Sequence, residues 1–209
     1  MNYLAHLFLA RMASTRLPPE QQALTLMGNL MGDFVKGQQF SHYPPQVASG
    51  IYQHREIDKY TDRHQEVVGL KNLLSGKRKR FSGIISDIVF DHFLAKEFAS
   101  YSPEPLSQFS ELCYRQLAAH LELMPEKMQR MVSRMIADDW LAGYQELSSV
   151  GLALDGVSRR IRFDNHLLGA IEEVQEHYSA YQQAFEVFFP QLLAFVVREK
   201  DFTLPKGEG

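Results

Sequence analysis

Apolar residues recur at spacings of three and four residues along almost the whole of this 209-residue chain. This spacing places apolar side chains on one face of an α-helix, whereas a half-buried strand requires strict alternation of apolar and polar residues. The sequence contains no sustained alternation beside a hairpin turn, apart from the short stretch LALDGVS at residues 152–158. The pattern therefore predicts an all-α protein, folded as a compact multi-helix bundle.

Proline and glycine divide this pattern into segments. Pro18 and Pro19 separate the first two segments, Gly37 ends the second, and Pro44 and Pro45 start the third. The spacing predicts helices over residues 2–13, 20–36, 44–62, 64–75, 81–100, 105–122, 125–137, 139–147, 152–161, 164–178 and 179–197.

Length and composition suit one compact domain, because 45% of the residues are hydrophobic and can form a substantial core. We expect a single all-helical domain at residues 1–200 and a flexible tail at residues 201–209, where few side chains can be buried. A net charge of -3 gives no general attraction to nucleic acid or to an anionic membrane. No apolar run reaches the roughly 18 residues of a membrane-spanning helix.

Cysteine content and the first residues bear on location. The single Cys113 excludes an internal disulfide, lacks a CxxC partner and is expected to pack in the core. The opening stretch MNYLAHLFLARM has no basic start and no small-residue cleavage site, so it does not resemble a signal peptide. These features predict a cytoplasmic protein.

The third segment carries the densest group of polar residues. His54, Asp58 and Asp62 follow one another at four-residue steps, so they project from neighbouring turns of one helix face. Arg55 lies beside them. A solvated face with ion pairs is an equal alternative for Asp62 and Lys59, whereas we favour a functional role for His54 and Asp58.

The stretch SDIVFDHFLAKEF places the adjacent pair Asp91 and His92 within an apolar helix. Burial of an unpaired carboxylate is costly, so such a pair points to a metal or to chemistry. Adjacent residues are about 100° apart on a helix, so one would contact a site and the other would support it. In the architectural alternative, His92 donates to a helix carbonyl and Asp91 accepts from an arginine such as Arg55.

Mixed imidazole and carboxylate ligands suit Mn²⁺, Fe²⁺ or Mg²⁺ better than the thiolate-rich sets of structural zinc. The chain offers this mixture without a thiolate partner. A lone histidine on an apolar helix, such as His6, is more often a hydrogen-bonded core residue than a metal ligand. His6 is a candidate ligand because the other candidate residues accompany it. The predicted metal ligands are His6, Asp33, His54, Asp91 and His92, with Asp58 also available.

Four blocks in order resemble the acyl carrier protein phosphodiesterases, also called acyl carrier protein hydrolyases. The blocks are MNYLAHLFLA, GNLMGDFVKG, IYQHREIDKYTD and DIVFDHFLAKEF. The resemblance is strong over the first half of the chain and continues more weakly through Trp140 and the segment FFPQLL.

The resemblance implies hydrolysis of the phosphodiester that joins 4′-phosphopantetheine to a serine of holo-acyl carrier protein. The products are apo-acyl carrier protein and free 4′-phosphopantetheine, and manganese is the implied metal, with Mg²⁺ or Fe²⁺ as alternatives. It also implies an HD-like bundle, an outlying branch of the HD-domain phosphohydrolases. The chain departs from that pattern, because Asp91 and His92 stand in reverse order, and Asp33 in GDFVKG is the best match for a metal-site aspartate.

The chemistry of these residues fits phosphodiester hydrolysis. A divalent ion lowers the pKa of bound water and polarises phosphoryl oxygens. We expect Asp58 or Asp62 to orient the water or accept a proton, and Arg55 to neutralise charge on the phosphoryl oxygens.

A basic run, Lys77, Arg78, Lys79 and Arg80, precedes the central apolar helix. Acyl carrier proteins are strongly acidic, so this run is predicted to bind the partner and steer it toward the site. The alternatives are an ordinary solvated loop or a contact with RNA or lipid.

Two other functions use the same residues. An HD-like phosphohydrolase acting on a nucleotide or a small phosphate ester would need a similar ligand set. A non-enzymatic helical adaptor would bind an acidic protein through the basic run and would need no metal.

Overall fold

The computed structural model describes residues 1–37, 40 and 42–199, and these residues form helices and loops without a strand. The all-α prediction is confirmed. The α-helices are α1 (Tyr3–Ser14), α2 (Pro19–Met31), α3 (Pro45–Arg63), α4 (Gln65–Leu70), α5 (Ser82–Lys96), α6 (Phe98–Tyr101), α7 (Leu106–Ala118), α8 (Glu126–Ala137), α9 (Trp140–Gly143), α10 (Leu147–Arg160), α11 (Ile171–Glu176) and α12 (Tyr178–Arg198). Short 3-10 helices are η1 (Lys71–Leu73), η2 (Lys79–Phe81) and η3 (Leu121–Leu123).

Most helix starts lie close to their predicted positions, and the predicted helices that differ most are corrected here. The helix expected over 152–161 begins earlier, at Leu147, and the one expected over 139–147 ends at Gly143. The helix expected over 20–36 ends at Met31, because Arg55 donates to the carbonyls of Val35 and Gly37 in the loop that follows. The helix expected over 164–178 begins only at Ile171, because His166 and Gly169 adopt the left-handed region at φ 55° and 70°. The predicted tail at residues 201–209 lies outside the described residues.

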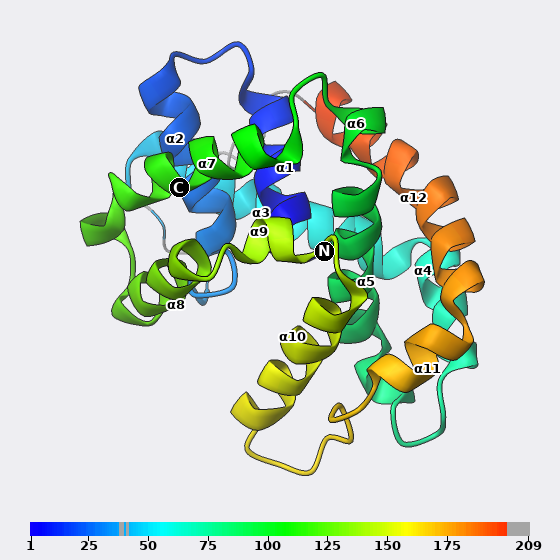
Figure 1. The fold of residues 1–209 in the computed structure, drawn as a ribbon. Coiled ribbons are helices and arrows are strands. Elements are labelled where there is room, and N and C mark those ends of the chain that lie inside the picture. The colour runs from blue at the N-terminus through cyan, green and yellow to red at the C-terminus, as the bar shows by residue number, and fades with distance from the viewer. Residues whose placement is uncertain (38–39, 41, 200–209) are drawn as a thin grey trace.

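Helices α1 and α5 lie at the centre of the molecule (Figure 1). Residues 4–10 of α1 are all buried, and so are most residues of α5 from Ile85 onward. Helix α1 packs against α2, α3, α5 and α12, and α5 also contacts α4, α10 and α12. A polar side chain on either central helix therefore needs a partner inside the protein.

Aromatic side chains fill the space between α5 and α12. Phe90 stacks on Phe188 at a centroid distance of 5.4 Å, and Phe93 contacts Phe185 at 5.7 Å. All four rings are fully buried. These aromatic residues therefore form part of the core. Cys113 is also buried, as predicted.

Helices α2 and α3 cross with their backbones in contact. A Cβ atom on Gly28 would lie 2.2 Å from the carbonyl oxygen of Val47, and one on Gly50 would lie 2.3 Å from that of Thr25. Only glycine permits this approach. The crossing holds the polar face of α3 against the end of α2 and against α1.

Helix α9 lies beside the start of α1, where Trp140 stacks with Tyr3, and α8 and α10 are separated from each other in the view of Figure 1. Helix α10 packs on α5, while α8 packs on α7 and α9. Over the described residues, none of the helices combines the length and apolar character needed to cross a membrane.

Candidate metal centre

Three ligand groups from α1 and α3 converge on one point. Nε2 of His54 lies 3.1 Å from one carboxylate oxygen of Asp58, and Nε2 of His6 lies 3.2 Å from the other. One ligand atom from each of the three residues lies within 4.8 Å of the others. The two imidazole rings stack, with centroids 4.0 Å apart. Asp58 therefore connects histidines that are 48 positions apart in the chain.

A buried amide pair orients His6. Nδ1 of His6 lies 2.8 Å from Oδ1 of Asn29, and the amide nitrogen of Asn29 donates to Oε1 of Gln53 at 2.8 Å. Because Asn29 uses its nitrogen on Gln53, its oxygen accepts the Nδ1 proton of His6. Nε2 is then left as the atom that can bind a metal, an arrangement typical of ligating histidines.

Asn29 and Gln53 were missed in the sequence analysis. Both side chains are almost completely buried. In the sequence, Asn29 lies four residues before Asp33, and Gln53 lies beside His54. These positions were the available signal that the two amides belong to the site. Such an amide carries no metal-ligand pattern of its own, so only the fold shows what it supports.

The loop after α2 brings Asp33 to the cluster. Its Oδ1 lies 3.4 Å from Nε2 of His54, and its side chain is 59% exposed. Gly32 precedes it, where a Cβ atom would lie 2.2 Å from the ring of His54. Glycine at this position therefore lets the imidazole pack against the end of α2.

Arg55 holds this loop in place. Its guanidinium donates to the carbonyls of Gly37 at 2.7 Å and Val35 at 2.8 Å, and it lies over the ring of Phe40 at 4.6 Å. These contacts occupy the group that we expected to neutralise phosphoryl charge. Arg55 lies in position to fix the loop that carries Asp33.

The protonation of the cluster follows from its charges. Burial alone would lower the pKa of His54, but the hydrogen bonds and charges of Asp33 and Asp58 outweigh it and raise that pKa to about 9. Burial and the neighbouring His54 charge lower the pKa of His6. Burial opposes ionisation of Asp58, yet its close contacts with His54 and His6 hold its pKa well below the usual range. The cluster thus stabilises a positive charge between two carboxylates.

A second positive charge lies nearby. The amino group of Met1 donates to Asp87 at 2.6 Å and lies 3.7 Å from Asp58. Burial lowers the pKa of this amine, but the charges of Asp87 and Asp58 outweigh it and raise the value to about 10. Asp87, which was not among the predicted site residues, therefore borders the cluster.

The residues fit a hard or intermediate divalent cation. Their donor atoms are imidazole nitrogen and carboxylate oxygen, which suit Mn²⁺, Fe²⁺ and Mg²⁺. The separations of 3.1, 3.2 and 3.4 Å are near the edge of roughly 3 Å expected for an octahedron with bonds of about 2.1 Å. Nε2 of His6 is buried and makes no hydrogen bond of acceptable geometry within the described part of the chain. An unsatisfied buried nitrogen is what a missing ligand partner would leave.

Asp91 has a different set of partners. Its fully buried carboxylate accepts the backbone N–H groups of Leu4 at 2.7 Å and Ala5 at 3.1 Å, at the N-terminus of α1. Burial raises the pKa of Asp91 to about 7, although the two N–H groups act against this shift. The carboxylate thus satisfies orphan donors of the helix that carries His6, and the arginine partner of the architectural alternative is not used.

His92 also lies outside the cluster. Its Nδ1 is 2.8 Å from the backbone oxygen of Tyr144, and its Nε2 is 2.9 Å from the hydroxyl of Tyr178. Both ring nitrogens therefore have partners. These contacts join α5 to the segment after α9 and to α12.

Asp62 lies on the exposed surface of α3, one turn beyond Asp58. Partial burial and the charges of Asp87 and Asp58 raise its pKa. The structure therefore places this carboxyl beside the cluster without making it a close partner of either histidine.

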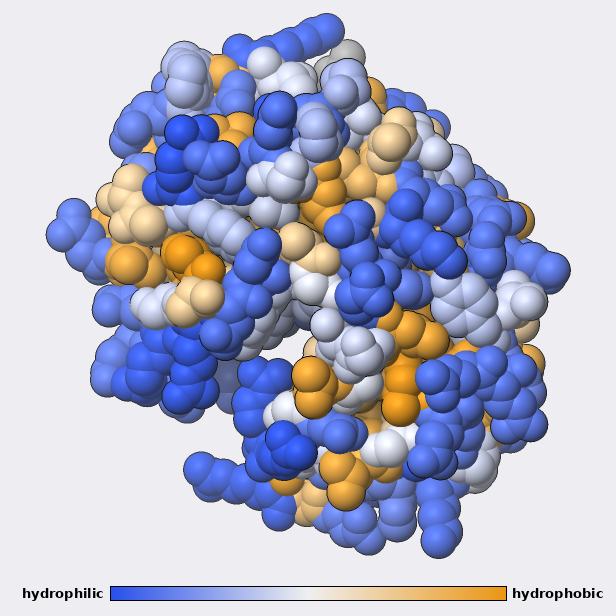
Figure 2. Space-filling view, in the orientation of Figure 1, coloured by the Kyte–Doolittle hydropathy of each residue, from blue (hydrophilic) through white to orange (hydrophobic). Residues whose placement is uncertain are grey.

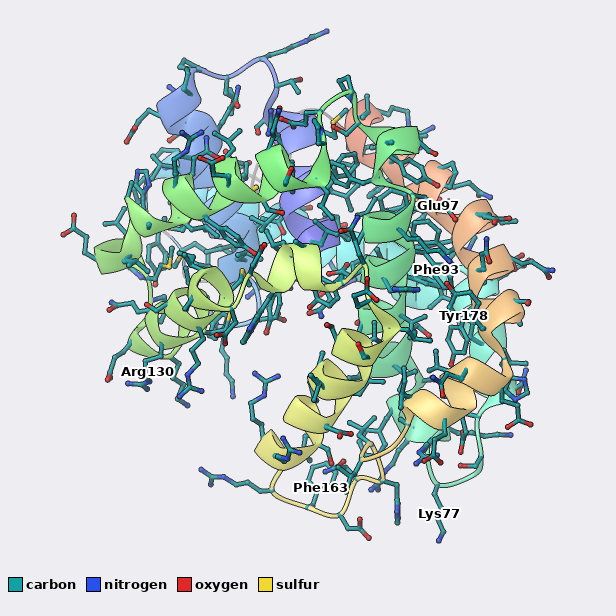
Figure 3. The ribbon with its side chains drawn as sticks, viewed as in Figure 1. Lys77, Phe93, Glu97, Arg130, Phe163 and Tyr178 are labelled. Atoms are coloured by element: carbon teal, nitrogen blue, oxygen red, sulfur yellow. The ribbon has the colours of Figure 1, made fainter. Side chains whose placement is uncertain are left out.

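The basic run divides into two kinds of residue. Arg78 donates to Glu173 at 2.7 Å and to the backbone oxygens of His166 and Leu168, and Arg80 donates to the backbone oxygen of Asp164. Both arginines thus hold the segment between α10 and α11. Lys77 projects from its loop into solvent (Figure 3).

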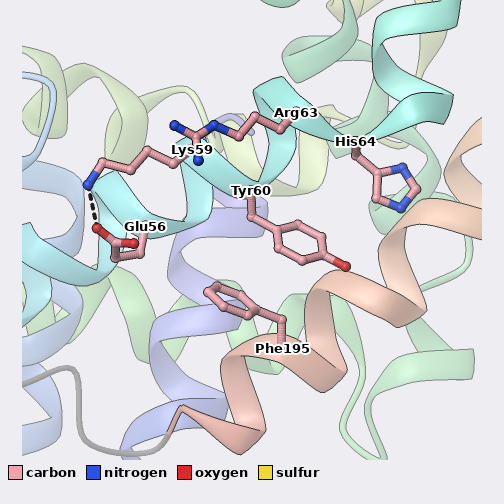
Figure 4. Close-up of a pocket in the computed structure, with 6 residues that line it drawn as sticks. All are labelled: Glu56, Lys59, Tyr60, Arg63, His64 and Phe195. Carbon is pink, nitrogen blue, oxygen red and sulfur yellow. Dashed lines mark hydrogen bonds and ion pairs between the residues drawn. The ribbon is translucent and has the colours of Figure 1, made fainter.

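A separate hollow lies on the opposite face of α3 (Figure 4). Lys59 donates to Glu56 at 2.6 Å there, and Tyr60 stacks on Phe195 with centroids 4.7 Å apart. His54 and Asp58 point away from this hollow, because they lie on the other side of the helix. It therefore contributes nothing to the cluster.

An all-α body in which two buried histidines meet a half-buried carboxylate defines a helical protein with a candidate metal centre. The chain belongs to the acyl carrier protein phosphodiesterase family, whose sequence profile matches residues 1–192. The resemblance seen in the four sequence blocks is thereby confirmed.

Full-length relatives carry the same description. An acyl carrier protein phosphodiesterase of Photorhabdus laumondii is 32% identical over 207 residues, covering 99% of this chain and 100% of the relative. Those of Salmonella agona and Salmonella dublin are each 33% identical over 201 residues, covering 95% of this chain and 99% of the relative. No solved structure matches the chain. The relation to HD-domain phosphohydrolases stays a prediction.

Proposed function

We propose that this protein is a metal-dependent phosphodiesterase that hydrolyses holo-acyl carrier protein to apo-acyl carrier protein and 4′-phosphopantetheine. Family membership supports the reaction. The observation that carries the metal dependence is the convergence of His6, His54 and Asp58, in which the buried Nε2 of His6 faces Asp58 without making a hydrogen bond within the described residues.

His6, His54 and Asp58 would hold the ion, and Asp33 would complete the set from the exposed side. Manganese is the first candidate, with Mg²⁺ or Fe²⁺ as alternatives. When bound, such an ion lowers the pKa of water and polarises the phosphoryl oxygens. Asp58, expected from the sequence to act on the water, is better assigned as a ligand because both of its oxygens face histidine nitrogens.

The surrounding residues position this set. Asn29 holds His6 in the required tautomer, and Arg55 fixes the loop that carries Asp33. Asp62 is exposed beside the cluster with a raised pKa, so it is the available group to orient water or accept a proton. Asp91 supports the helix that carries His6.

The partner would be the acidic holo-acyl carrier protein. The protein would be located in the cytoplasm. Within the basic run, Lys77 and Lys79 are available to steer it, since neither forms an ion pair with a carboxylate of the described residues. Arg78 and Arg80 would act through the loop that they hold.

Mass spectrometry of holo-acyl carrier protein incubated with the purified protein and Mn²⁺ tests the proposal. We expect loss of the mass of the prosthetic arm, and no loss when a chelator removes the metal. Release of phosphate from nucleotides without cleavage of the carrier protein would favour the other phosphohydrolase function instead.

Replacement of Asp33 sharpens this test. Asp33→Ala should remove turnover and leave the helical circular dichroism unchanged, because Asp33 is largely exposed and follows the last turn of α2. A variant with normal metal-dependent turnover would contradict the proposed site.

A further inference from the structure

A cavity of about 510 Å³ lies between α8, α9, α10 and the start of α1. Its walls include Asn2 and Tyr3 from the start of α1, Trp140 from α9, and Val157 and Arg160 from α10. Figure 2 shows the surface hollowed in this region. We refer to it as the α8–α10 cleft. Its volume is within the range of about 300–1,000 Å³ that is usual for small-molecule sites.

The cleft reaches the metal centre through Tyr3. Tyr3 lies three residues before His6, so the two side chains project from adjacent turns of α1 on the same side. Burial raises the pKa of Tyr3, the positive charge of Arg160 acts against this shift, and the negative charge of Asp33 adds to it. Ile88, another wall residue, directly follows Asp87 at the edge of the cluster.

The lining combines apolar surface with unpaired positive charge. Tyr3 stacks with Trp140 at a centroid distance of 6.1 Å, and Val157 and Ile88 add aliphatic surface. The positive charge of Arg160 acts on the Tyr3 phenol, where it opposes the rise in pKa that burial causes. Neither Arg160 nor Arg134 on the opposite wall pairs with a carboxylate of the described residues, in contrast to Arg130, which pairs with a glutamate.

An unpaired arginine beside a metal centre is suited to an anionic group, because its guanidinium matches phosphate oxygens. The apolar walls beyond it require an occupant with aliphatic character. Ser149 also lines the cleft and offers a hydroxyl group for a hydrogen bond to an amide. These demands describe a flexible amide chain that ends in phosphate.

We propose that the α8–α10 cleft receives the 4′-phosphopantetheine arm of the substrate, with Arg160 contacting the phosphate and Trp140 and Val157 facing the pantetheine chain. This inference rests on the proposed function. It assigns a binding role to α8, α9 and α10, in the second half of the chain. It also places the phosphate at the end of the cleft nearest to Tyr3 and the metal centre.

Gly156→Leu is a direct test. Gly156 lines the cleft on α10, and a Cβ atom there would meet no atom within 4 Å. A leucine side chain can therefore enter the cleft without displacing the protein, and leucine favours helix over glycine. Calorimetry with free 4′-phosphopantetheine and the Mn²⁺-loaded protein should show binding weakened about tenfold or more. The kcat/KM for holo-acyl carrier protein should fall by a similar factor.

Gly69→Leu on α4 is the matched control. A Cβ atom at Gly69 also meets no atom within 4 Å, but this residue does not line the cleft. The control should bind 4′-phosphopantetheine as the unmodified protein does. Arg160→Gln should weaken binding about tenfold, and Arg160→Lys should restore part of it, because the phosphate needs a positive charge.

The outcomes separate this inference from the proposed function. Arm release by the unmodified protein, together with equal 4′-phosphopantetheine binding by Gly156→Leu, would overturn the cleft assignment and leave the reaction intact. Calorimetric binding that Gly156→Leu abolishes, without any arm release from the carrier protein, would support the cleft and reject the reaction. Tighter binding of adenosine monophosphate, lost in Gly156→Leu, would overturn the proposed occupant.

Discussion

Two regions of this molecule bury histidine and aspartate together, and they use them differently. In the α1 and α3 region, His6, His54 and Asp58 direct their ligand atoms toward one another. In α5, Asp91 and His92 are neighbours in sequence, yet Asp91 binds the start of α1 and His92 binds Tyr144 and Tyr178. The histidines of both regions are buried, whereas the Asp58 side chain is 39% exposed and Asp91 is fully buried.

The difference follows from helix geometry. A four-residue step brings His54 and Asp58 to the same face of α3, whereas adjacent residues of α5 diverge by about 100°. The satisfaction of polar atoms differs as well. His92 has a partner at each nitrogen, while Nε2 of His6 lacks a hydrogen bond within the described residues. A pair whose buried polar atoms all have hydrogen-bond partners supports the fold. A group that leaves a buried nitrogen without a hydrogen bond can bind a ligand there.

The strongest challenge to this comparison replaces one histidine from each region. His54→Ala should lower metal-dependent kcat/KM by about a thousandfold or more, because it removes a proposed ligand. His92→Ala should leave the reaction within a few-fold and lower the melting temperature, since it leaves a buried carbonyl unsatisfied. Turnover assays and thermal unfolding of both variants measure these two effects. Loss of turnover in a stable His92→Ala protein would contradict the comparison.

The α5 region can also be tested through pH. The pKa of Asp91 is 3.8 in the unfolded chain and about 7 in the fold. Folding therefore takes up a proton between these values, so stability is fully present below pH 3.8 and is lost as pH rises through 7. Three pKa units correspond to a loss of up to about 4 kcal/mol in the free energy of unfolding.

Asp91→Asn removes this titration. Denaturant unfolding at pH 4 to 8 should show the unmodified protein losing stability relative to Asp91→Asn as pH rises. Asp164→Asn, on an exposed loop, controls for the change in net charge. A stability difference that stays constant with pH would reject the titration of Asp91.

The α1 and α3 region predicts a smaller effect at its supporting amide. Asn29→Ala should weaken metal affinity by about 10- to 100-fold, because His6 loses the partner that fixes its tautomer. Thr25→Ala on the same helix is the control, since its hydroxyl donates to the carbonyl of Gln21 within α2. Calorimetric titration with Mn²⁺ measures both. Equal affinities would show that the amide pair does not act on the ligand.

The smallest effect is expected at the basic run. Lys77→Glu combined with Lys79→Glu should slow association with holo-acyl carrier protein a few-fold at low salt and weaken its salt dependence. Arg78→Ala should instead lower the melting temperature, because Arg78 holds the loop near Glu173 and His166. Stopped-flow association at two ionic strengths measures the steering. Association rates that the lysine substitutions leave unchanged would reject the electrostatic steering by the basic run.

Much of the helical arrangement was predictable because apolar spacing and proline positions are local signals. Pro19 and Pro45 begin α2 and α3 as expected. The loop at residues 164–170 was not predictable as such, because it depends on distant arginines: Arg78 and Arg80 bind its carbonyls. A carbonyl that bonds to a distant side chain leaves no mark in the local spacing.

The sequence by itself determined the helices and the shared face of His54 and Asp58, because one helix sets the directions of its own side chains. Only the tertiary structure decided that His6 and Asn29 join them and that Asp91 faces the start of α1. Contacts between helices depend on how closely the backbones approach, as at Gly28 and Gly50. That approach is a property of the packed molecule, and it selects which of many buried polar residues meet.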